Sequence, residues 1–246
     1  MRYKITLSYN GADFCGWQVQ PSAPTVQGTL EKALSTLLKT GTGVVGAGRT
    51  DTGVNAIGYV AHFDAAEIPD RALFCYKLNA ILPSSISVSS ITPVEDSFHA
   101  RFSATGRKYT YFLHRVKDPF VDKFSYFYGY PGLDVDAMNR AASLILGTHD
   151  FSCFEKTGGD NKTSICTVRQ ASWEAYGPGN GDYLKFTVTA DRFLRNMVRA
   201  IVGTLLEVGR GKRTPGSVAE LLEAKDRCAA GESVPGHALF LSGIEY

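Results

Sequence analysis

A strand followed by a loop and an amphipathic helix is predicted in both halves of this chain. Residues 2–9 alternate between apolar and polar side chains, as in a half-buried strand, and residues 26–38 carry apolar side chains at helical spacing. The same order returns in residues 183–190 and 193–208. Few helices, many strands and a repeated strand-helix unit are typical of an α+β fold with two related halves.

Capping residues mark where the predicted helices begin and end. Thr25 is a favoured N-cap, Gly209 follows the second long helix, and two further helices are expected over 134–146 and 215–227. Segments rich in alternating β-formers predict additional strands over 58–64, 86–92, 107–115, 124–130, 165–175 and 239–246. A length of 246 residues allows one large domain or two modest ones. We expect two halves, 1–104 and 105–246, each a mainly antiparallel sheet with helices on one face.

Positive charge is concentrated in two short segments. Residues 97–117 carry five basic side chains and no acidic one, and residues 192–213 carry six against Glu207 alone. Each segment therefore holds +5, and because the net charge is +2 the remaining residues sum to −8. A solvated protein surface would show the same charge. Here, however, aromatic residues lie between the Lys and Arg side chains, and aromatic rings stack on unpaired nucleobases while Lys and Arg bind phosphates. RNA or single-stranded DNA is the leading partner class, and we expect the halves to form a positively charged RNA-binding cleft.

Several other classes of protein have no support in the sequence. No segment approaches the roughly 18 consecutive apolar residues of a membrane span, and residues 1–11 lack the pattern of a secretory signal. The five cysteines are odd in number and include no CxxC pair, which favours free thiols in the reducing cytoplasm. The five histidines are scattered without ligand spacing, so no metal site is expected.

A glycine-rich run formally matches a dinucleotide-binding fingerprint at Gly41, Gly43 and Gly46. That fingerprint must follow a strand and open a helix, so that the helix N-terminus meets the pyrophosphate. Here a predicted helix comes before it, and Val44 and Val45 favour a strand after it. The context therefore argues against a nucleotide cofactor at this run.

The most unusual run is GRTDTGVNA, from Gly48 to Ala56, in which Asp51 lies between two hydroxyl residues. By composition alone it is typical of a turn in which Asp51 bonds its own backbone and Gly53 takes a positive φ. The run from Gly48 to Val54 also resembles the catalytic loop of the tRNA pseudouridine synthase A family.

Four further segments are similar to signatures of the same family. They are FCGWQ at 14–18, FHARFSA at 98–104 followed by RKYTY at 107–111, NMVRAIVG at 196–203, and AKDR at 224–227. The matches occur in family order and cover nearly the whole chain, although residues 155–164 have no counterpart. Asn55 stands where the family commonly has histidine, so no role for that imidazole is carried over.

The resemblance implies an isomerase that converts uridine to pseudouridine at positions 38, 39 and 40 in the anticodon stem-loop of tRNA. It implies a homodimer that binds tRNA and needs neither metal nor organic cofactor. Asp51 corresponds to the nucleophile of the family. A carboxylate can attack either the sugar carbon or the uracil ring, and both routes remain open.

The remaining site residues follow from the matches and from electrostatics. A partly buried aspartate stays ionised only beside a cation, and Arg199, placed with Arg192 and Arg195 along one side of the long helix, is flanked by apolar residues and needs an anion. We expect Arg199 to pair with Asp51, and Arg49 to contact the flipped nucleotide or its phosphate. Tyr109 is expected to stack on the extruded uracil. The wider expected tRNA-binding set is Phe98, His99, Ala100, Arg101, Phe102, Arg107 and Lys108.

Two other functions remain open at this point. A nucleic-acid binding module without chemistry would use the same basic, aromatic-rich segments, but it would gain nothing from Asp51 among phosphates. A nucleotide-dependent enzyme using the glycine-rich run would be stabilised by a dinucleotide or ATP.

Overall fold

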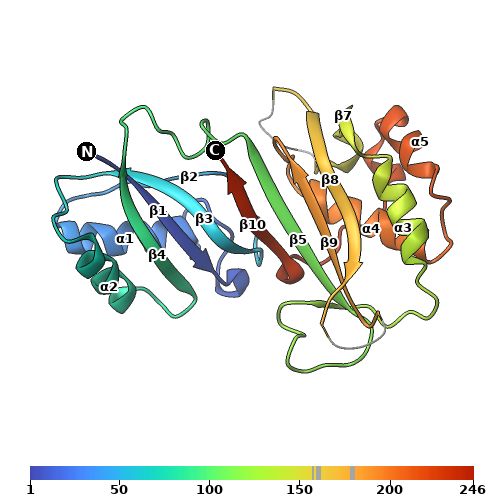
Figure 1. Cartoon of the computed structure of the whole chain (residues 1–246), viewed down its shortest axis with the longest axis horizontal. Coiled ribbons are helices and arrows are strands. Elements are labelled where there is room, and N and C mark those ends of the chain that lie inside the picture. The colour runs from blue at the N-terminus through green and yellow to red at the C-terminus, as the bar shows by residue number, and fades with distance from the viewer. Residues whose placement is uncertain (157, 159–161, 178–180) are drawn as a thin grey trace. The chain divides into compact units, whose positions relative to one another are not determined.

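The computed structural model describes residues 1–156, 158, 162–177 and 181–246, and Figure 1 shows the path of the chain. The chain packs as two compact units: Met1–Thr105 together with Phe240–Tyr246, and Gly106–Leu239. This division differs from the expected halves in assigning the last strand to the first unit. In both units the strands pair mainly antiparallel, and the described residues contain five α-helices, as expected for an α+β chain. Part of the unmatched segment 155–164, namely 157 and 159–161, lies outside the described residues.

The first unit is built on four neighbouring strands. Their order is β4 (Ile86–Val94), β1 (Arg2–Tyr9), β3 (Asn55–Asp64) and β10 (Leu239–Glu245), and the short β2 (Val45–Gly46) also pairs with β3. β1 lies antiparallel to both neighbours, whereas β10 is parallel to β3. Every second side chain of β1 is buried, so the alternation seen in the sequence marks the face that packs into the core.

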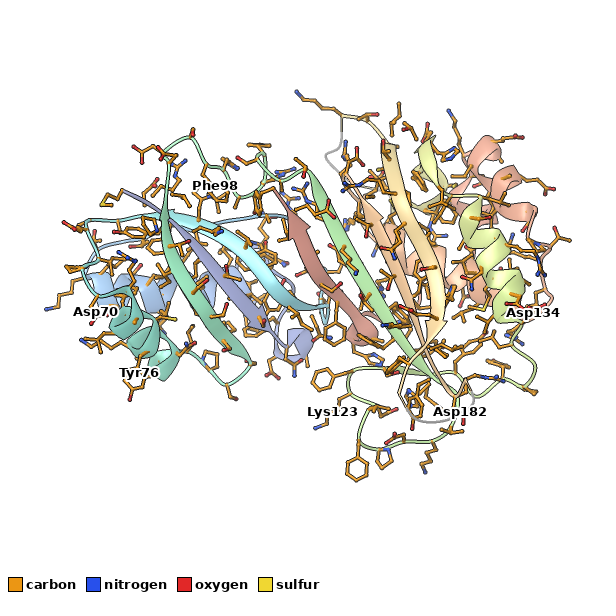
Figure 2. The ribbon with its side chains drawn as sticks, viewed as in Figure 1. Asp70, Tyr76, Phe98, Lys123, Asp134 and Asp182 are labelled. Atoms are coloured by element: carbon orange, nitrogen blue, oxygen red, sulfur yellow. The ribbon has the colours of Figure 1, made fainter. Side chains whose placement is uncertain are left out.

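Two helices belong to the first unit. In α1 (Val26–Leu38) the Thr25 hydroxyl accepts a hydrogen bond from the Gly28 N–H at 3.3 Å, which confirms the predicted cap, and the helix ends at Lys39 with φ +55°. The second helix, α2 (Arg71–Ile81), was not predicted from the sequence and is capped by Asp70 (labelled in Figure 2). Leu78 is its only buried residue, so α2 lacks the apolar stripe by which helices are recognised.

The second unit has a sheet in the order β5 (Gly106–His114), β9 (Tyr183–Ala190), β8 (Ile165–Ala175) and β7 (Gly147–Asp150), with β6 (Tyr126–Phe127) parallel to β5. Its helices are α3 (Val135–Ser143), α4 (Met197–Gly209) and α5 (Ser217–Ala224). Eleven of the thirteen residues of α4 are buried, and α3 packs against both α4 and β8. The buried helix α4 therefore forms the centre of this unit.

Several predicted boundaries in the second unit were wrong, and one of them is the end of α3, which lies at Ser143 rather than 146. The long helix begins at Met197 rather than 193, because Asn196 at φ +65° breaks the helical backbone. Arg192 and Arg195 therefore precede the helix and do not share a side of it with Arg199. The strand expected over 124–130 is reduced to β6, and the helix expected over 215–227 ends at Ala224, where Lys225 takes φ +56°.

No helix among the described residues has both the length and the apolar character needed to cross a membrane. All five cysteines lie in the described part of the chain and are free thiols.

Candidate active site

Asp51 lies in a tight turn between β2 and β3. The Val54 N–H donates to the Asp51 carbonyl at 3.1 Å, and Gly53 takes φ +76°. Thr50 and Val54, on either side of the turn, are buried, whereas Asp51 is half-buried and Thr52 is exposed. The predicted turn is thus present, and it holds Asp51 between Thr50 and Val54, which are both buried.

Three buried aromatic residues hold the backbone that leads into Asp51. The Tyr9 and Thr50 hydroxyls are hydrogen-bonded at 2.8 Å, the backbone N–H of Trp17 donates to the Thr50 carbonyl at 3.2 Å, and the Tyr59 hydroxyl donates to the Gly48 carbonyl. The Trp17 and Tyr59 ring centroids are 4.2 Å apart. We call Tyr9, Trp17 and Tyr59 the aromatic clamp, because together they fix the residues on the N-terminal side of Asp51.

Glycines let the FCGWQ segment and the Asp51 turn approach each other closely. A Cβ at Gly16 would lie 2.4 Å from the Thr50 carbonyl oxygen, and one at Gly11 would lie 2.2 Å from the Val54 carbonyl oxygen. The Gly11 N–H donates at 2.9 Å to the side chain of Asn55, which is 1% exposed. Asn55, at the position where the family commonly has histidine, therefore has a structural role here.

The glycine-rich run has the wrong context for a nucleotide site. Gly41 and Gly43 follow α1 and are exposed, and Gly46 lies in β2. A Cβ at Gly46 would lie 2.1 Å from the Tyr59 hydroxyl, so this glycine serves the packing of the aromatic clamp. The run opens no helix, which removes the structural basis for a dinucleotide site.

The FHARFSA segment forms a compact turn after β4. The Ser103 N–H donates to the His99 carbonyl at 2.9 Å, and His99 Nδ1 accepts from the N–H groups of Arg101 and Phe102 at 3.2 Å each. Phe98, labelled in Figure 2, packs against Tyr246 with ring centroids 5.1 Å apart. The turn is therefore held by its own side chains and by the C-terminal tyrosine.

Within this turn the expected binding residues divide into buried and exposed. Ala100 is completely buried, and its N–H donates to His62 Nδ1 at 3.1 Å while its carbonyl accepts from the Tyr246 hydroxyl at 2.8 Å. Phe102 is 76% exposed, with the Arg101 guanidinium carbon 5.5 Å from its ring centre. Ala100 thus anchors the turn, whereas Arg101 and Phe102 are exposed on its surface.

His62 acts in this turn as a neutral acceptor. Burial lowers its pKa to about 4, and the nearby charges of Arg2 and His99 act in the same direction. At neutral pH its ring therefore carries no charge, and Nδ1 can accept the Ala100 N–H.

In the second unit Tyr109 lies on β5, opposite Val188 of β9. Its ring meets Phe193 edge-to-face, with centroids 5.0 Å apart and planes at 85°. Tyr109 is half-buried, unlike Tyr111 on the same face of the strand, which is fully buried and donates to the Pro235 carbonyl at 3.1 Å. Of the two tyrosines, Tyr109 is the one with a surface left for a ligand.

Arg199 lies in the first turn of α4 and is half-exposed. Its Nε–H donates to the Val234 carbonyl at 2.7 Å, and Val202 and Leu206 beside it are buried, so the predicted apolar flank is present. Arg107 donates to the Asp191 carbonyl at 3.0 Å, and Lys108 is half-buried on β5. The second unit thus carries three cations and Tyr109 on β5 and the start of α4.

Comparison with known proteins places the chain in a family. A family model described as tRNA pseudouridine synthase matches residues 141–246. The chain is 51% identical to the tRNA pseudouridine synthase A of Parabacteroides distasonis, over all of this chain and 96% of that protein. It is 48% identical to that of Bacteroides thetaiotaomicron, over all of this chain and 90% of that protein, and 44% identical to that of Bacillus subtilis, over all of this chain and 99% of that protein.

The chain belongs to the tRNA pseudouridine synthase A family. The resemblance found in the sequence is thereby confirmed, and with it the expected class of enzyme, an isomerase that forms pseudouridine in tRNA. Among the described residues, no group of three or more His, Cys, Asp or Glu side chains is arranged to hold a metal ion.

For a tRNA pseudouridine synthase, the site contains residues that the sequence did not single out. Tyr9 and Tyr59 of the aromatic clamp contact Thr50 and Gly48 in the run that carries Asp51, and Phe193 contacts Tyr109. Tyr9 ends a predicted strand and Tyr59 lies within another, so both looked like ordinary core residues. Their contacts join positions distant in sequence, which no local pattern signals.

Proposed function

We propose that this protein isomerises uridine to pseudouridine at positions 38, 39 and 40 of the tRNA anticodon stem-loop, with Asp51 as the nucleophile. The observation that carries this proposal is the half-buried carboxylate at a turn whose two neighbours are anchored and whose backbone is held by the aromatic clamp. A nucleophile held in one geometry has already lost most of the entropy that an attack would otherwise cost.

The reaction needs a group that attacks and then leaves. The bond from uracil N1 to the ribose C1′ breaks, the base turns, and a bond from uracil C5 to C1′ forms, while C5 loses a proton and N1 gains one. A carboxylate bonded for a time to C1′, or to the ring, meets both needs, because it is a nucleophile and a stable leaving group. Product and substrate are isomers, so the sequence of steps requires no external oxidant or reductant.

Arg199 pairs with the Asp51 carboxylate, and Arg49 contacts the flipped nucleotide or its phosphate. Arg199 is flanked by buried apolar residues, and a cation in that setting is stabilised by an anion. Arg49 is exposed two residues before Asp51, within reach of a phosphate on a nucleotide at the turn.

Tyr109 stacks on the extruded uracil. Extrusion of a stem nucleotide costs a few kcal/mol, and stacking on an aromatic ring returns about 1 to 3 kcal/mol. The half-buried ring of Tyr109, braced by Phe193, is suited to this because little side-chain freedom is lost on binding.

The remaining predicted residues bind the tRNA backbone and neighbouring bases across a positively charged cleft between the two halves. Arg101 and Phe102 make direct contact, and Phe98, His99 and Ala100 act through the shape of the turn that presents them. Arg107 and Lys108 bind phosphates beside Tyr109. The enzyme works as a homodimer in the cytoplasm.

The substitution Asp51→Asn tests this function. The asparagine keeps the size of the side chain and removes the negative charge, so turnover should vanish while tRNA affinity stays equal or rises slightly. Asp13→Asn is the matched control, since it makes the same change at an exposed carboxylate of the same unit and should leave turnover unchanged. Pseudouridine is mapped at single-nucleotide resolution on an unmodified tRNA transcript, and binding is measured separately.

Two results would overturn the proposal. If the wild-type protein binds tRNA but forms no pseudouridine, it is a binding module. If Asp51→Asn forms pseudouridine within about tenfold of the wild-type rate, a barrier change of only about 1.4 kcal/mol, Asp51 is not the nucleophile.

A further inference from the structure

The segment 231–235, which follows α5, runs along α4 in close contact. The Gly231 N–H donates to the Thr204 hydroxyl at 2.9 Å, and the Val234 N–H donates to the Arg199 carbonyl at 3.3 Å. Between these points the backbones nearly touch, because a Cβ at Gly203 would lie 1.8 Å from the Glu232 carbonyl oxygen. The glycine in the helix therefore allows the segment to lie directly on α4.

Ser233 is the most connected side chain of this segment. Its hydroxyl oxygen accepts hydrogen bonds from Asn196 Nδ2 and from an Arg227 terminal nitrogen, the latter at 3.1 Å. The other terminal nitrogen of Arg227 donates to the Gly231 carbonyl at 3.2 Å. Arg227 thus spans the segment, and Ser233 links it to Asn196, the residue that begins α4 with φ +65°.

The same segment sets the direction of Arg199. The guanidinium is planar, so a hydrogen bond from Nε–H restrains the plane in which both terminal nitrogens also lie. Arg199 Nε donates to the Val234 carbonyl at 2.7 Å, immediately after Ser233. Any shift of Ser233 therefore moves the acceptor that holds Arg199.

We propose that segment 231–235 is the positioning element for Arg199, with Ser233 as its key positioning residue and Arg227 and Asn196 as its supports. This inference rests on the proposed role of Arg199 as the ion-pair partner of Asp51. A fixed guanidinium can meet a carboxylate in one geometry, and misplacement by about 1 Å costs on the order of 100-fold in rate. Arg227, within the AKDR signature, would then contribute to catalysis through Arg199.

The test compares Ser233→Ala with Ser217→Ala in the full-length enzyme. Ser217→Ala removes a serine hydroxyl from the same unit. That hydroxyl donates to the Thr214 carbonyl at 2.7 Å, outside segment 231–235. Three quantities are measured: the single-turnover rate, the dissociation constant for tRNA, and the hydrogen-exchange rate of the Arg199 Nε–H by NMR. The NMR signal is assigned by its loss in Arg199→Lys.

We expect Ser233→Ala to lower the single-turnover rate at least tenfold and to speed Nε–H exchange at least tenfold, with the tRNA dissociation constant within about twofold. Ser217→Ala should change none of the three, and Ser233→Thr, which keeps the hydroxyl, should restore the rate. Lysine has no Nε–H donor at that position. In an Arg199→Lys background, Ser233→Ala should therefore lower the single-turnover rate by less than about twofold.

Each alternative outcome is informative. Unchanged Nε–H exchange in Ser233→Ala would overturn the proposal whatever the rate. Faster exchange with a wild-type rate would show that Arg199 need not be fixed for catalysis, which also overturns it. The exchange measurement does not depend on activity. Failure of this proposal can therefore be distinguished from failure of the proposed function, which Asp51→Asn tests. Should Ser233→Ala fail to fold, Arg227→Lys, which keeps the charge and removes the two-pronged contact, is measured in the same way.

Discussion

The substitution Gly16→Ala should displace the Asp51 turn and slow the reaction. Gly16 has φ +87°, and an added Cβ would lie 2.4 Å from the Thr50 carbonyl oxygen. Cβ atoms do not come within 3.0 Å of a backbone oxygen, so Thr50 must move by at least about 0.6 Å. Since a misplacement of about 1 Å costs on the order of 100-fold in rate, we expect the single-turnover rate to fall roughly 10- to 100-fold.

Substitutions at two other glycines of the first unit distinguish the displacement of the Asp51 turn from the effect of backbone strain. Gly58 has φ +66° but no atom within 4 Å of an added Cβ, and Gly43 has neither a positive φ nor a close neighbour. A left-handed conformation costs an L-residue about 1 to 2 kcal/mol, or roughly 2 to 8 °C in melting temperature at this chain length. Gly58→Ala should therefore lose stability and keep its rate, and Gly43→Ala should lose neither.

Melting temperature and single-turnover pseudouridine formation on one tRNA transcript measure both effects. The decisive comparison is between Gly16→Ala and Gly58→Ala, because both carry the strain of a positive φ. Equal rates in these two variants, within about twofold, would refute the argument that contact with Gly16 sets the position of Asp51.

Two further predictions concern single side chains. Tyr109→Phe should retain tRNA binding and Tyr109→Leu should weaken it, because only the phenylalanine keeps the ring that Phe193 braces; equal dissociation constants in the two variants would remove Tyr109 from the stacking site. The unfolded chain protonates His62 near its ordinary pKa of 6.5, whereas the native pKa is about 4, so stability should fall as pH drops from 6.5 to 4, by up to about 3 kcal/mol. Urea unfolding should show a smaller fall in His62→Gln, and parallel pH profiles for the two proteins would contradict this origin.

The sequence predicted the fold best where one face of an element is buried. β8 and β9 begin and end at the predicted residues, because apolar and polar side chains alternate along both segments of the sequence. α2 has only Leu78 in the core and was missed for that reason. The start of α4 was misplaced because Phe193 and Leu194 continue the apolar pattern, although the backbone turns helical only after Asn196.

Part of the candidate site was predictable from one short run. The positive φ of Gly53 follows from the composition of that run, whereas the role proposed for Asp51 rests on its resemblance to the catalytic loop of the family. The aromatic clamp does not follow from the run, because the bond from Tyr9 to Thr50 joins residues 41 positions apart. A tyrosine in a predicted strand gives no sign that its hydroxyl will hold the backbone of a distant loop. Such contacts arise only when the tertiary fold brings the two segments together.

Two family signatures, FCGWQ and AKDR, contain no residue proposed to take part directly in the reaction, and both hold other residues in place. FCGWQ contributes Gly16 and Trp17 to the residues that hold the Asp51 turn, and AKDR contributes Arg227 to the segment that holds Arg199. In each unit a charged residue proposed for catalysis is thus fixed by a segment distant in sequence. Charged groups held in advance lose no freedom at the moment of reaction. Substitutions in these segments should therefore lower the rate constant for turnover while tRNA affinity changes little, whereas substitutions of Arg101 or Lys108 should weaken affinity first.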